Sequence, residues 1–341
     1  MTLKKAKLQL KRILQNHNHM PVLLWGQPGV GKSMAVKQVA EELGMRFIDI
    51  RLPLLMPSDL LGLPYPDKEH RRAKWLEPSF FPEQDSKEKI LILFDEIGNA
   101  PMTVQNGCYR IILDRSIGDH YTFPKGVKIV AASNRETDKS GVGKFNSALA
   151  NRFIHFNIDA DLDAWKFWAL KNGINEMVIG FLNFSQTLLC KEPKVEDKAY
   201  PTPRSWHKVS DLLNSGISDE DVIAGTIGKG AASEFFNYIE VYKDLPDIKK
   251  ILAGEKIKMP KSPSVLYALS SSLVVRANEK NIDNIFKFSE GMLQEFHILT
   301  IRDIVRKDDD AKTFKACSRY QQWLNKYSRF YDDDSEETTE E

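Results

Sequence analysis

The 341-residue chain has little of several features that mark specialised classes of protein. Its three cysteines, Cys108, Cys190 and Cys317, lie far apart and lack C-x-x-C or Cys/His spacing, so we expect neither a disulfide framework nor a zinc site. No apolar run approaches the roughly 18 residues that a membrane-spanning helix needs. The N-terminus carries lysines but no continuous apolar stretch, so no secretion signal is expected. These absences predict a cytoplasmic protein with reduced thiols.

The chain also lacks a large net charge of either sign, and its seven histidines include no H-x-x-x-H pair. The formal charge of +1 gives no global signal for binding nucleic acid or membranes. Charge is nevertheless unevenly placed, because residues 1–12 are rich in lysine and residues 332–341 are almost entirely acidic. An acidic stretch cannot bury apolar surface, so we expect 331–341 to be a disordered, solubilising tail.

What the chain does have is a regular alternation of strand-like and helix-like segments in its first half. Apolar residues at helical spacing predict an amphipathic helix over 2–17, and short apolar runs that end in turns predict strands. The expected strands are 20–25, 47–50, 90–94, 128–132 and 153–158, and further helices are expected over 33–43 and 104–113. Strands that alternate with helices predict a parallel sheet with helices on both faces.

Two segments interrupt this alternation. Prolines recur between residues 52 and 88, which excludes one long helix there and predicts an irregular insert with short elements. Residues 116–123 contain Gly118-Asp119, which is compatible with a hairpin turn.

Strand signals fade after residue 159, and residues 160–330 are predicted to be helices separated by prolines. The aromatic residues Trp165, Phe167 and Trp168 are expected in the core of this helical part. We therefore predict an α/β ATPase domain of the P-loop NTPase αβα sandwich type over 1–158. An all-helical lid and C-terminal helical region over 159–330 follows it, and the acidic tail follows over 331–341.

The strongest local motif is G-x-x-x-x-G-K-[ST], which the sequence fits without a mismatch. The eight residues are Gly26, Gln27, Pro28, Gly29, Val30, Gly31, Lys32 and Ser33, and Met34 follows them. Glycines let backbone N–H groups surround phosphate oxygens, and the following helix points its positive end at them. Lys32 is expected to reach the β and γ phosphates, and Ser33 to offer its hydroxyl to Mg²⁺. An ordinary Gly-Pro turn before a helix is the alternative, but a strand before and a helix after favour the nucleotide site.

A second motif ends the apolar run 90–94 with two carboxylates, Asp95 and Glu96. Two acids at the end of a buried strand are costly without a cationic partner, and Mg²⁺ supplies one. We expect Asp95 to hold the metal and Glu96 to polarise the attacking water. The alternative, a helix N-cap pair, is less favoured about sixty residues after a phosphate loop. The chain has no N-K-x-D segment for reading guanine, which favours ATP over GTP.

With these two motifs placed, the chain resembles the AAA+ ATPases, and among them the MoxR-like group, from about residue 1 to about residue 330. Residues 128–134 resemble the sensor-1 strand of that family, which implies that Asn134 helps to hold the lytic water. Residues 149–153 resemble its A-L-x-x-R-F segment, which implies that Arg152 enters the ATP site of a neighbouring subunit. Residues 202–206 resemble the start of its sensor-2 helix, which implies that Arg204 contacts the γ-phosphate.

Some of these residues have alternatives. Without the resemblance, a surface salt bridge would be the favoured role for Arg152. Arg135 follows Asn134 where many MoxR proteins have proline, so Arg135 is a second candidate for the residue that reaches between subunits. A plain helix start also explains Thr202 and Pro203.

The resemblance also implies a biology. Such ATPases form homo-oligomeric rings, for which six subunits is the expected number, and many remodel or mature a protein partner, often one with a von Willebrand factor A-type domain. Residues 52–82 and 115–125 lie where the family carries inserts that engage substrates or partners. Two alternatives remain open: a nucleic-acid motor or loader, and an ATP-gated assembly switch. The basic cluster at 70–75 is more in keeping with a solvated loop or an acidic partner than with nucleic acid.

Overall fold

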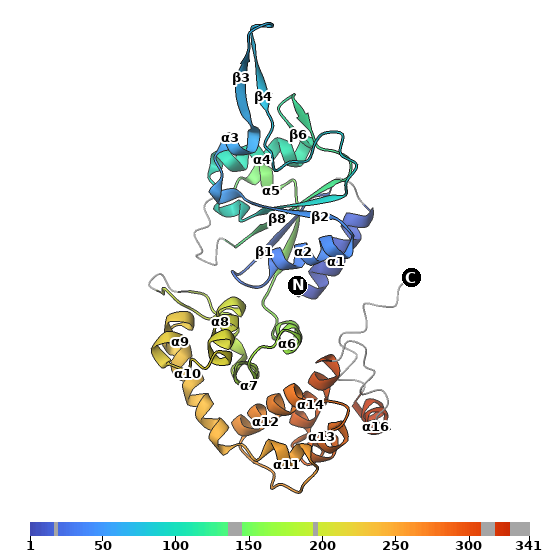
Figure 1. Ribbon diagram of the computed structural model, residues 1–341, viewed down its shortest axis with the longest axis vertical. Coiled ribbons are helices and arrows are strands. Elements are labelled where there is room, and N and C mark those ends of the chain that lie inside the picture. Colours follow the sequence, from blue (N-terminus) through green and yellow to red (C-terminus); the bar gives the residue numbers. More distant parts are fainter. Residues whose placement is uncertain (17–19, 136–144, 194–196, 308–317, 328–341) are drawn as a thin grey trace. The chain divides into compact units, whose positions relative to one another are not determined.

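The computed structural model describes residues 1–16, 20–135, 145–193, 197–307 and 318–327 (Figure 1). The chain divides into two compact units, one formed by Met1–Asp161 with Glu192–Glu196 and the other by Leu162–Lys191 with Asp197–Glu341. The predicted acidic tail over 331–341 and Cys317 lie outside the described residues. Among the described helices, none is long and apolar enough to cross a membrane.

The first unit is built on a five-stranded parallel sheet with the strand order β2-β5-β8-β1-β9. Its strands are β1 (Val22–Gly26), β2 (Arg46–Arg51), β5 (Ile90–Asp95), β8 (Val127–Ser133) and β9 (Ile154–Ile158). All five were predicted from the apolar runs. The order sets β8 between the strands that carry the two motifs, so the carboxyl ends of β1, β8 and β5 are neighbours.

Side chains of these strands alternate between two cores. On β5, Ile90, Ile92 and Phe94 join one apolar cluster, and Leu91 and Leu93 join another. The first cluster is completed by α4 (Met102–Asp114), and the second by α1 (Leu3–Asn16) and α2 (Lys32–Glu42). The strand is therefore buried on both faces, as an unbroken apolar run predicts. The predicted αβα sandwich is confirmed (Figure 1).

Two hairpins extend this unit. The predicted hairpin over 116–123 is confirmed as β6 (Ser116–Ile117) and β7 (Tyr121–Thr122). The insert contains the 3₁₀ turn η1 (Leu52–Leu54) and α3 (Pro57–Leu61). It also contains a longer hairpin that the sequence did not predict, β3 (Leu63–Asp67) and β4 (Arg72–Leu76), which projects from the sheet (Figure 1).

The two hairpins are in contact. The rings of Trp75 on β4 and His120 in the β6–β7 turn stack with centroids 5.3 Å apart. Gln84, in the segment after β4, donates to the carbonyl oxygen of His120 at 3.0 Å and accepts from the backbone N–H of Thr122 at 3.1 Å. The two inserts therefore form one continuous projection, although they lie far apart in the sequence.

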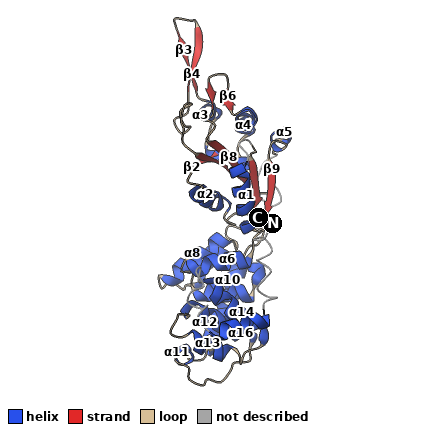
Figure 2. Cartoon of the chain, turned by 90° about the vertical axis from the view of Figure 1, so that its right-hand side faces the viewer, coloured by secondary structure: helices blue, strands red, loops and turns tan. Residues whose placement is uncertain are grey.

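The second unit contains no strand in its described residues, as predicted (Figure 2). Its helices are α6 (Leu162–Lys171), α7 (Glu176–Phe184), α8 (Pro203–Asn214), α9 (Glu220–Ile227), α10 (Lys229–Ile239), α11 (Ile248–Leu252), α12 (Pro263–Arg276), α13 (Ile282–Ser289), α14 (Gln294–Lys307) and α16 (Ser318–Tyr327), with 3₁₀ turns at Gln186–Leu188 and Glu240–Asp244.

An ion pair between Lys166 and Asp303 joins α6 to α14, with Nζ and Oδ2 3.0 Å apart and both side chains at most 4% exposed. Asp163, in the first turn of α6, also binds Arg302 at 3.1 Å. A buried charge persists only with close partners, so this network fixes α6 to α14.

The prediction that three aromatic residues of α6 lie in the core is only partly right. Trp165 is 8% exposed, and Trp168 is half-buried with its ring edge-on to His207. Phe167 is exposed instead, and the ammonium group of Lys171 lies 3.8 Å from the centre of its ring. An aromatic ring partly covered by a lysine needs no core position, because cation–π contact and the lysine stem shield one face.

Candidate active site

The first motif forms a turn between β1 and α2. Gly31 precedes α2 with φ 96° and ψ 17°, a left-handed conformation that favours glycine. Gly26 ends β1 so close to β9 that a Cβ atom there would lie 2.8 Å from the carbonyl oxygen of Ile158. Met34, also predicted to bind nucleotide, is 56% exposed in the first turn of α2. The turn therefore leads from the end of β1 directly into the N-terminus of α2, the end of a helix that favours an anion.

Lys32 is the buried centre of this turn, with 8% of its surface exposed. Its ammonium donates to the carbonyl oxygens of Gly26 at 2.6 Å and Gln27 at 3.1 Å. It also donates to the side-chain oxygen of Asn134 at 2.9 Å. Asn134 directly follows β8, so the predicted sensor residue lies against the predicted phosphate-binding lysine.

Ser33 and Asp95 join the two motifs directly. The Ser33 hydroxyl donates to Oδ2 of Asp95 at 2.7 Å. A hydroxyl and a carboxylate are hard oxygen ligands, and Mg²⁺ takes one or two such protein ligands while it keeps several waters. The predicted metal ligands are therefore adjacent, and their chemistry fits Mg²⁺.

Glu96 has an unusual backbone for its residue type, with φ 57° and ψ 34°. Among the described residues, only Arg71 and Arg115 share a positive φ without being glycine. The backbone N–H of Glu96 donates to Oδ1 of Asp95 at 2.9 Å, and the side chain of Glu96 is exposed. The left-handed turn sends the chain away from the sheet immediately after Asp95.

This backbone predicts a difference in thermal stability between two substitutions of Glu96. A left-handed conformation costs a non-glycine residue about 1 kcal/mol, and asparagine tolerates it better than most residues. Glu96→Asn is therefore expected to unfold at a higher temperature than Glu96→Gln, which keeps the cost. Thermal unfolding of the two full-length variants measures the difference. A Glu96→Asn variant that unfolds at or below the temperature of Glu96→Gln would show that the turn is not strained.

Ser133 is a residue of the site that the sequence did not single out. It is 1% exposed at the end of β8, where its hydroxyl accepts from the backbone N–H of Gly98 at 3.2 Å and donates to the carbonyl oxygen of Asn134 at 2.9 Å. A serine that ends a buried apolar strand was the available signal. Ser133 ties the turn that follows Glu96 to the segment that carries Asn134.

Arg135 follows Asn134 at the carboxyl end of β8, and its side chain is bound within its own chain. One of its Nη atoms donates to the carbonyl oxygen of Ile158 at 2.7 Å and to Asp159 at 2.6 Å. The Arg135 guanidinium lowers the pKa of Asp159 by hydrogen bonding to its carboxylate. Arg135 is therefore engaged by residues at the end of β9.

Arg152 lies in the turn between α5 (Ser147–Ala150) and β9. Its Nη2 donates to the hydroxyl oxygen of Tyr109 on α4 at 2.7 Å, and its guanidinium carbon lies 5.3 Å from the centre of that ring. The sequence did not predict this tyrosine. The surface salt bridge considered as the alternative is not found among the described residues, where the partner of Arg152 is a phenol.

Arg204 belongs to the second unit, where it is exposed in the first turn of α8. Thr202 caps this helix, since its side chain accepts from the backbone N–H of Ser205 at 3.0 Å and Ser205 bonds back to the N–H of Thr202. The plain helix start that the sequence allowed is thus present, and it leaves Arg204 projecting from the first turn.

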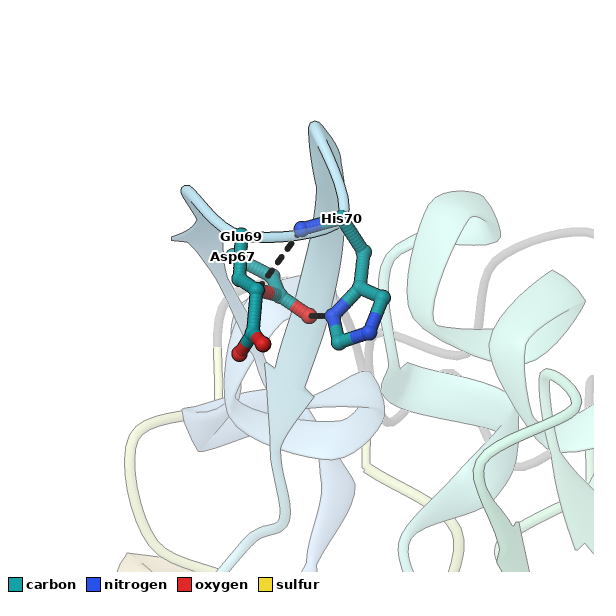
Figure 3. Close-up of side chains that lie close together, drawn as sticks. All are labelled: Asp67, Glu69 and His70. Atoms are coloured by element: carbon teal, nitrogen blue, oxygen red, sulfur yellow. Dashed lines mark hydrogen bonds and ion pairs between the residues drawn. The ribbon is translucent and has the colours of Figure 1, made fainter.

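A cluster of possible metal ligands also occurs at the tip of the β3–β4 hairpin, where Asp67, Glu69 and His70 lie together (Figure 3). The carboxylate of Asp67 is already bound by Lys74 at 3.0 Å and by the His70 ring at 2.9 Å. Hydrogen bonding to Lys74, more than any other contact, lowers the pKa of Asp67 to about 2. An ammonium at that distance repels a metal ion, so the cluster is an ion-pair network of the hairpin.

Comparison with known proteins agrees with this geometry. Residues 21–155 match the family model described as "ATPase family associated with various cellular activities (AAA)", so this part of the chain is an AAA-family ATPase domain. Midasin from Giardia intestinalis is 30% identical over 159 residues, which are 45% of this chain. The match spans 3% of the length of midasin.

The solved structures that match this chain include proteins from two organisms. NtrX from Brucella abortus, solved with ADP, has a TM-score of 0.43 and 11% identity over 95% of this chain and 68% of its own. The RuvB Holliday junction branch migration motor from Thermotoga maritima has a TM-score of 0.40 and 17% identity over 88% of this chain and 86% of its own.

Proposed function

We propose, from the AAA-family ATPase domain at residues 21–155, that this chain is a MoxR-like AAA+ ATPase that hydrolyses ATP with Mg²⁺. The observation that carries the proposal is a pair of contacts at the phosphate-binding turn, Lys32 with Asn134 and Ser33 with Asp95. They join a phosphate-binding turn, two hard oxygen ligands and a polar residue at the carboxyl ends of β1, β5 and β8. Ligands of open parallel sheets bind at this end of the strands.

The roles follow from charge and position. The turn from Gly26 to Ser33, with Met34, binds the nucleotide, and Lys32 meets the β and γ phosphates. Ser33 and Asp95 hold Mg²⁺, which neutralises charge on the phosphates when it is bound. Glu96 polarises the attacking water, and Asn134 helps to orient it.

We further propose that the active form is a homo-oligomeric ring, with six subunits expected. Arg152 is then offered to the ATP site of the next subunit, where a guanidinium offsets charge on the γ-phosphate. Arg204, which is exposed in the first turn of α8, is proposed to contact the γ-phosphate. The ring remodels or matures a protein partner in the cytoplasm, for which a von Willebrand factor A-type protein is the leading candidate.

The alternatives find less support. A nucleic-acid motor has less support because the formal charge of the chain is only +1, and because Arg72 and Lys74 of the basic β3–β4 hairpin pair with Asp67. An ATP-gated switch that rarely hydrolyses ATP has less need of a carboxylate at Glu96. This residue directly follows β5 and is exposed.

The function is tested by phosphate release from ATP with Mg²⁺ or with EDTA, for the wild type and for Lys32→Met. Methionine keeps most of the volume of this buried side chain but cannot meet phosphate, so we expect hydrolysis to fall on the order of 10²-fold or more. Lys37→Met, an exposed change on the same helix, is the control. Hydrolysis that survives in Lys32→Met, or that does not need Mg²⁺, would contradict the proposed site.

A further inference from the structure

One side of α4 makes polar contacts with the segment that carries Arg152. Gln105, Asn106 and Tyr109 all bond to residues between 146 and 152. Residues four apart on a helix share a face, so Gln105 and Tyr109 lie one turn apart on the side of α4 that meets α5. The same helix follows the Glu96 turn directly, through η2 (Ile97–Asn99) and Pro101.

Gln105 is the buried link at the start of this face, with 1% of its surface exposed. Its amide nitrogen donates to the carbonyl oxygen of Ala100 at 3.0 Å, and its amide oxygen accepts from the backbone N–H of Asn146 at 3.1 Å. Ala100 closes the η2 turn, since its N–H bonds to the carbonyl oxygen of Ile97. A buried amide must satisfy both of its ends, so Gln105 holds the end of the Glu96 turn and the start of α5 together.

Asn146 in turn begins α5. Its side-chain oxygen accepts from the N–H groups of Ala148 at 2.9 Å and Leu149 at 3.2 Å, and its amide nitrogen donates to Asn106 at 2.8 Å. Leu149 is fully buried in the core that α4 completes. The short helix is thus fixed to α4 at its first residue and through its core side chain.

Tyr109 holds the other end of this segment. The phenol oxygen accepts a hydrogen bond from Nη2 of Arg152, and the ring lies against the guanidinium. In the described part of the chain, the buried Nε of Arg152 has no hydrogen-bond partner. The guanidinium is therefore oriented mainly by Tyr109. Because arginine is long and has many rotamers, a partner that limits them has a large effect on where the guanidinium lies.

β9 steadies the same turn from the opposite side. Trp25, the residue before Gly26, donates from its indole N–H to Nδ1 of His155 at 2.7 Å. Because Nδ1 accepts this bond, the proton of the neutral ring must be on Nε2, which lies 2.9 Å from the carbonyl oxygen of Ala150. The turn that carries Arg152 is thus held between α4 and β9, while Tyr109 supplies the hydrogen bond to the guanidinium itself.

We propose that Tyr109 is a positioning residue for Arg152 and that α4 couples the Glu96 turn of one subunit to the arginine which that subunit offers to its neighbour. The inference rests on the proposed trans role of Arg152. A preoriented guanidinium meets the developing charge without first losing rotamer freedom, so the effect falls on kcat rather than on ATP binding.

The test is a double-mutant cycle on kcat with Tyr109→Phe and Arg152→Ala in the assembled protein. Phenylalanine keeps the ring and removes the hydroxyl that accepts from Arg152. We expect Tyr109→Phe alone to lower kcat roughly tenfold, because a hydrogen bond to a charged group is lost, and to leave KM for ATP unchanged. In the Arg152→Ala background the same change is expected to have an effect of less than about twofold.

Tyr242→Phe, which removes a hydroxyl that donates to the carbonyl oxygen of Glu176 in the helical unit, is the matched control and should leave kcat unchanged. If Arg152→Ala lowers kcat strongly while Tyr109→Phe does not, the positioning role is wrong and the proposed function stands. If the two changes multiply in the double variant, Tyr109 acts independently of Arg152 and the inference is overturned. If Arg152→Ala itself is silent, the proposed trans mechanism fails first.

Discussion

Replacing Glu96 by glutamine is expected to lower kcat for ATP on the order of 10²–10⁴-fold and to leave nucleotide binding intact. Glutamine keeps the size of the side chain and the left-handed backbone at this position, but it cannot draw a proton from the attacking water. Lys32 is held by the carbonyl oxygen of Gly26 and Ser33 by the carboxylate of Asp95, so the phosphate-binding turn should be unchanged. Single-turnover hydrolysis and a fluorescent-nucleotide titration measure the two quantities.

The matched control is Glu41→Gln, the same chemical change at an exposed position of α2, which should hydrolyse ATP as the wild type does. Loss of nucleotide binding in Glu96→Gln would show a structural rather than a chemical role. A kcat within about threefold of wild type would exclude Glu96 as the base, because general-base catalysis contributes at least 10²-fold. A kcat of Glu96→Gln close to that of the wild type would favour the ATP-gated switch instead.

Arg152→Ala is expected to lower kcat on the order of 10³–10⁵-fold in the assembled protein, with the ATP affinity and the mass of the assembly unchanged. The reason is that the guanidinium offsets charge that develops only as the γ-phosphate leaves. Wild-type activity per subunit should rise with protein concentration as rings form, and the activity of Arg152→Ala should stay low at every concentration. Phosphate release combined with light scattering measures both.

Arg46→Ala is the control, because Arg46 is an exposed arginine paired with Glu88 at 3.2 Å on the edge strand. It should retain wild-type turnover. An Arg152→Ala variant that assembles and turns over normally would contradict the account, and Arg152 would then be only the structural partner of Tyr109. The concentration dependence separates this outcome from a failure to assemble.

The sequence predicted the sheet because its strands are buried on both faces. In β5, apolar residues at consecutive positions serve two cores, and such an unbroken run is typical of a central strand in a parallel sheet. The motif spacing then predicted a nucleotide site at the ends of β1 and β5. Spacing could not add Asn134 to this site, because Lys32 and Asn134 are 102 positions apart. Only the family resemblance implied it, and the strand order brings the two residues together.

The β3–β4 hairpin was missed because Pro64 and Pro66 lie within β3. Proline lacks a backbone N–H donor and argues against a central strand, but a two-stranded ribbon leaves every second N–H free of pairing. Every residue of β4 is exposed, so no alternation of apolar and polar residues marked that strand. The contact of Tyr109 with Arg152 was missed for another reason: it joins α4 to a turn 43 positions later, and no spacing rule covers such a pair.

The central claim is that each ATP site is completed by Arg152 of another subunit, and mixing two inactive variants tests it most directly. Glu96→Gln subunits lack the base but keep Arg152, and Arg152→Ala subunits keep the base. If the arginine acts in trans, an equal mixture restores activity at about a quarter of the sites, where an Arg152→Ala site meets a Glu96→Gln neighbour. If Arg152 serves its own chain, every site in the mixture stays defective and no activity returns, which would contradict the account.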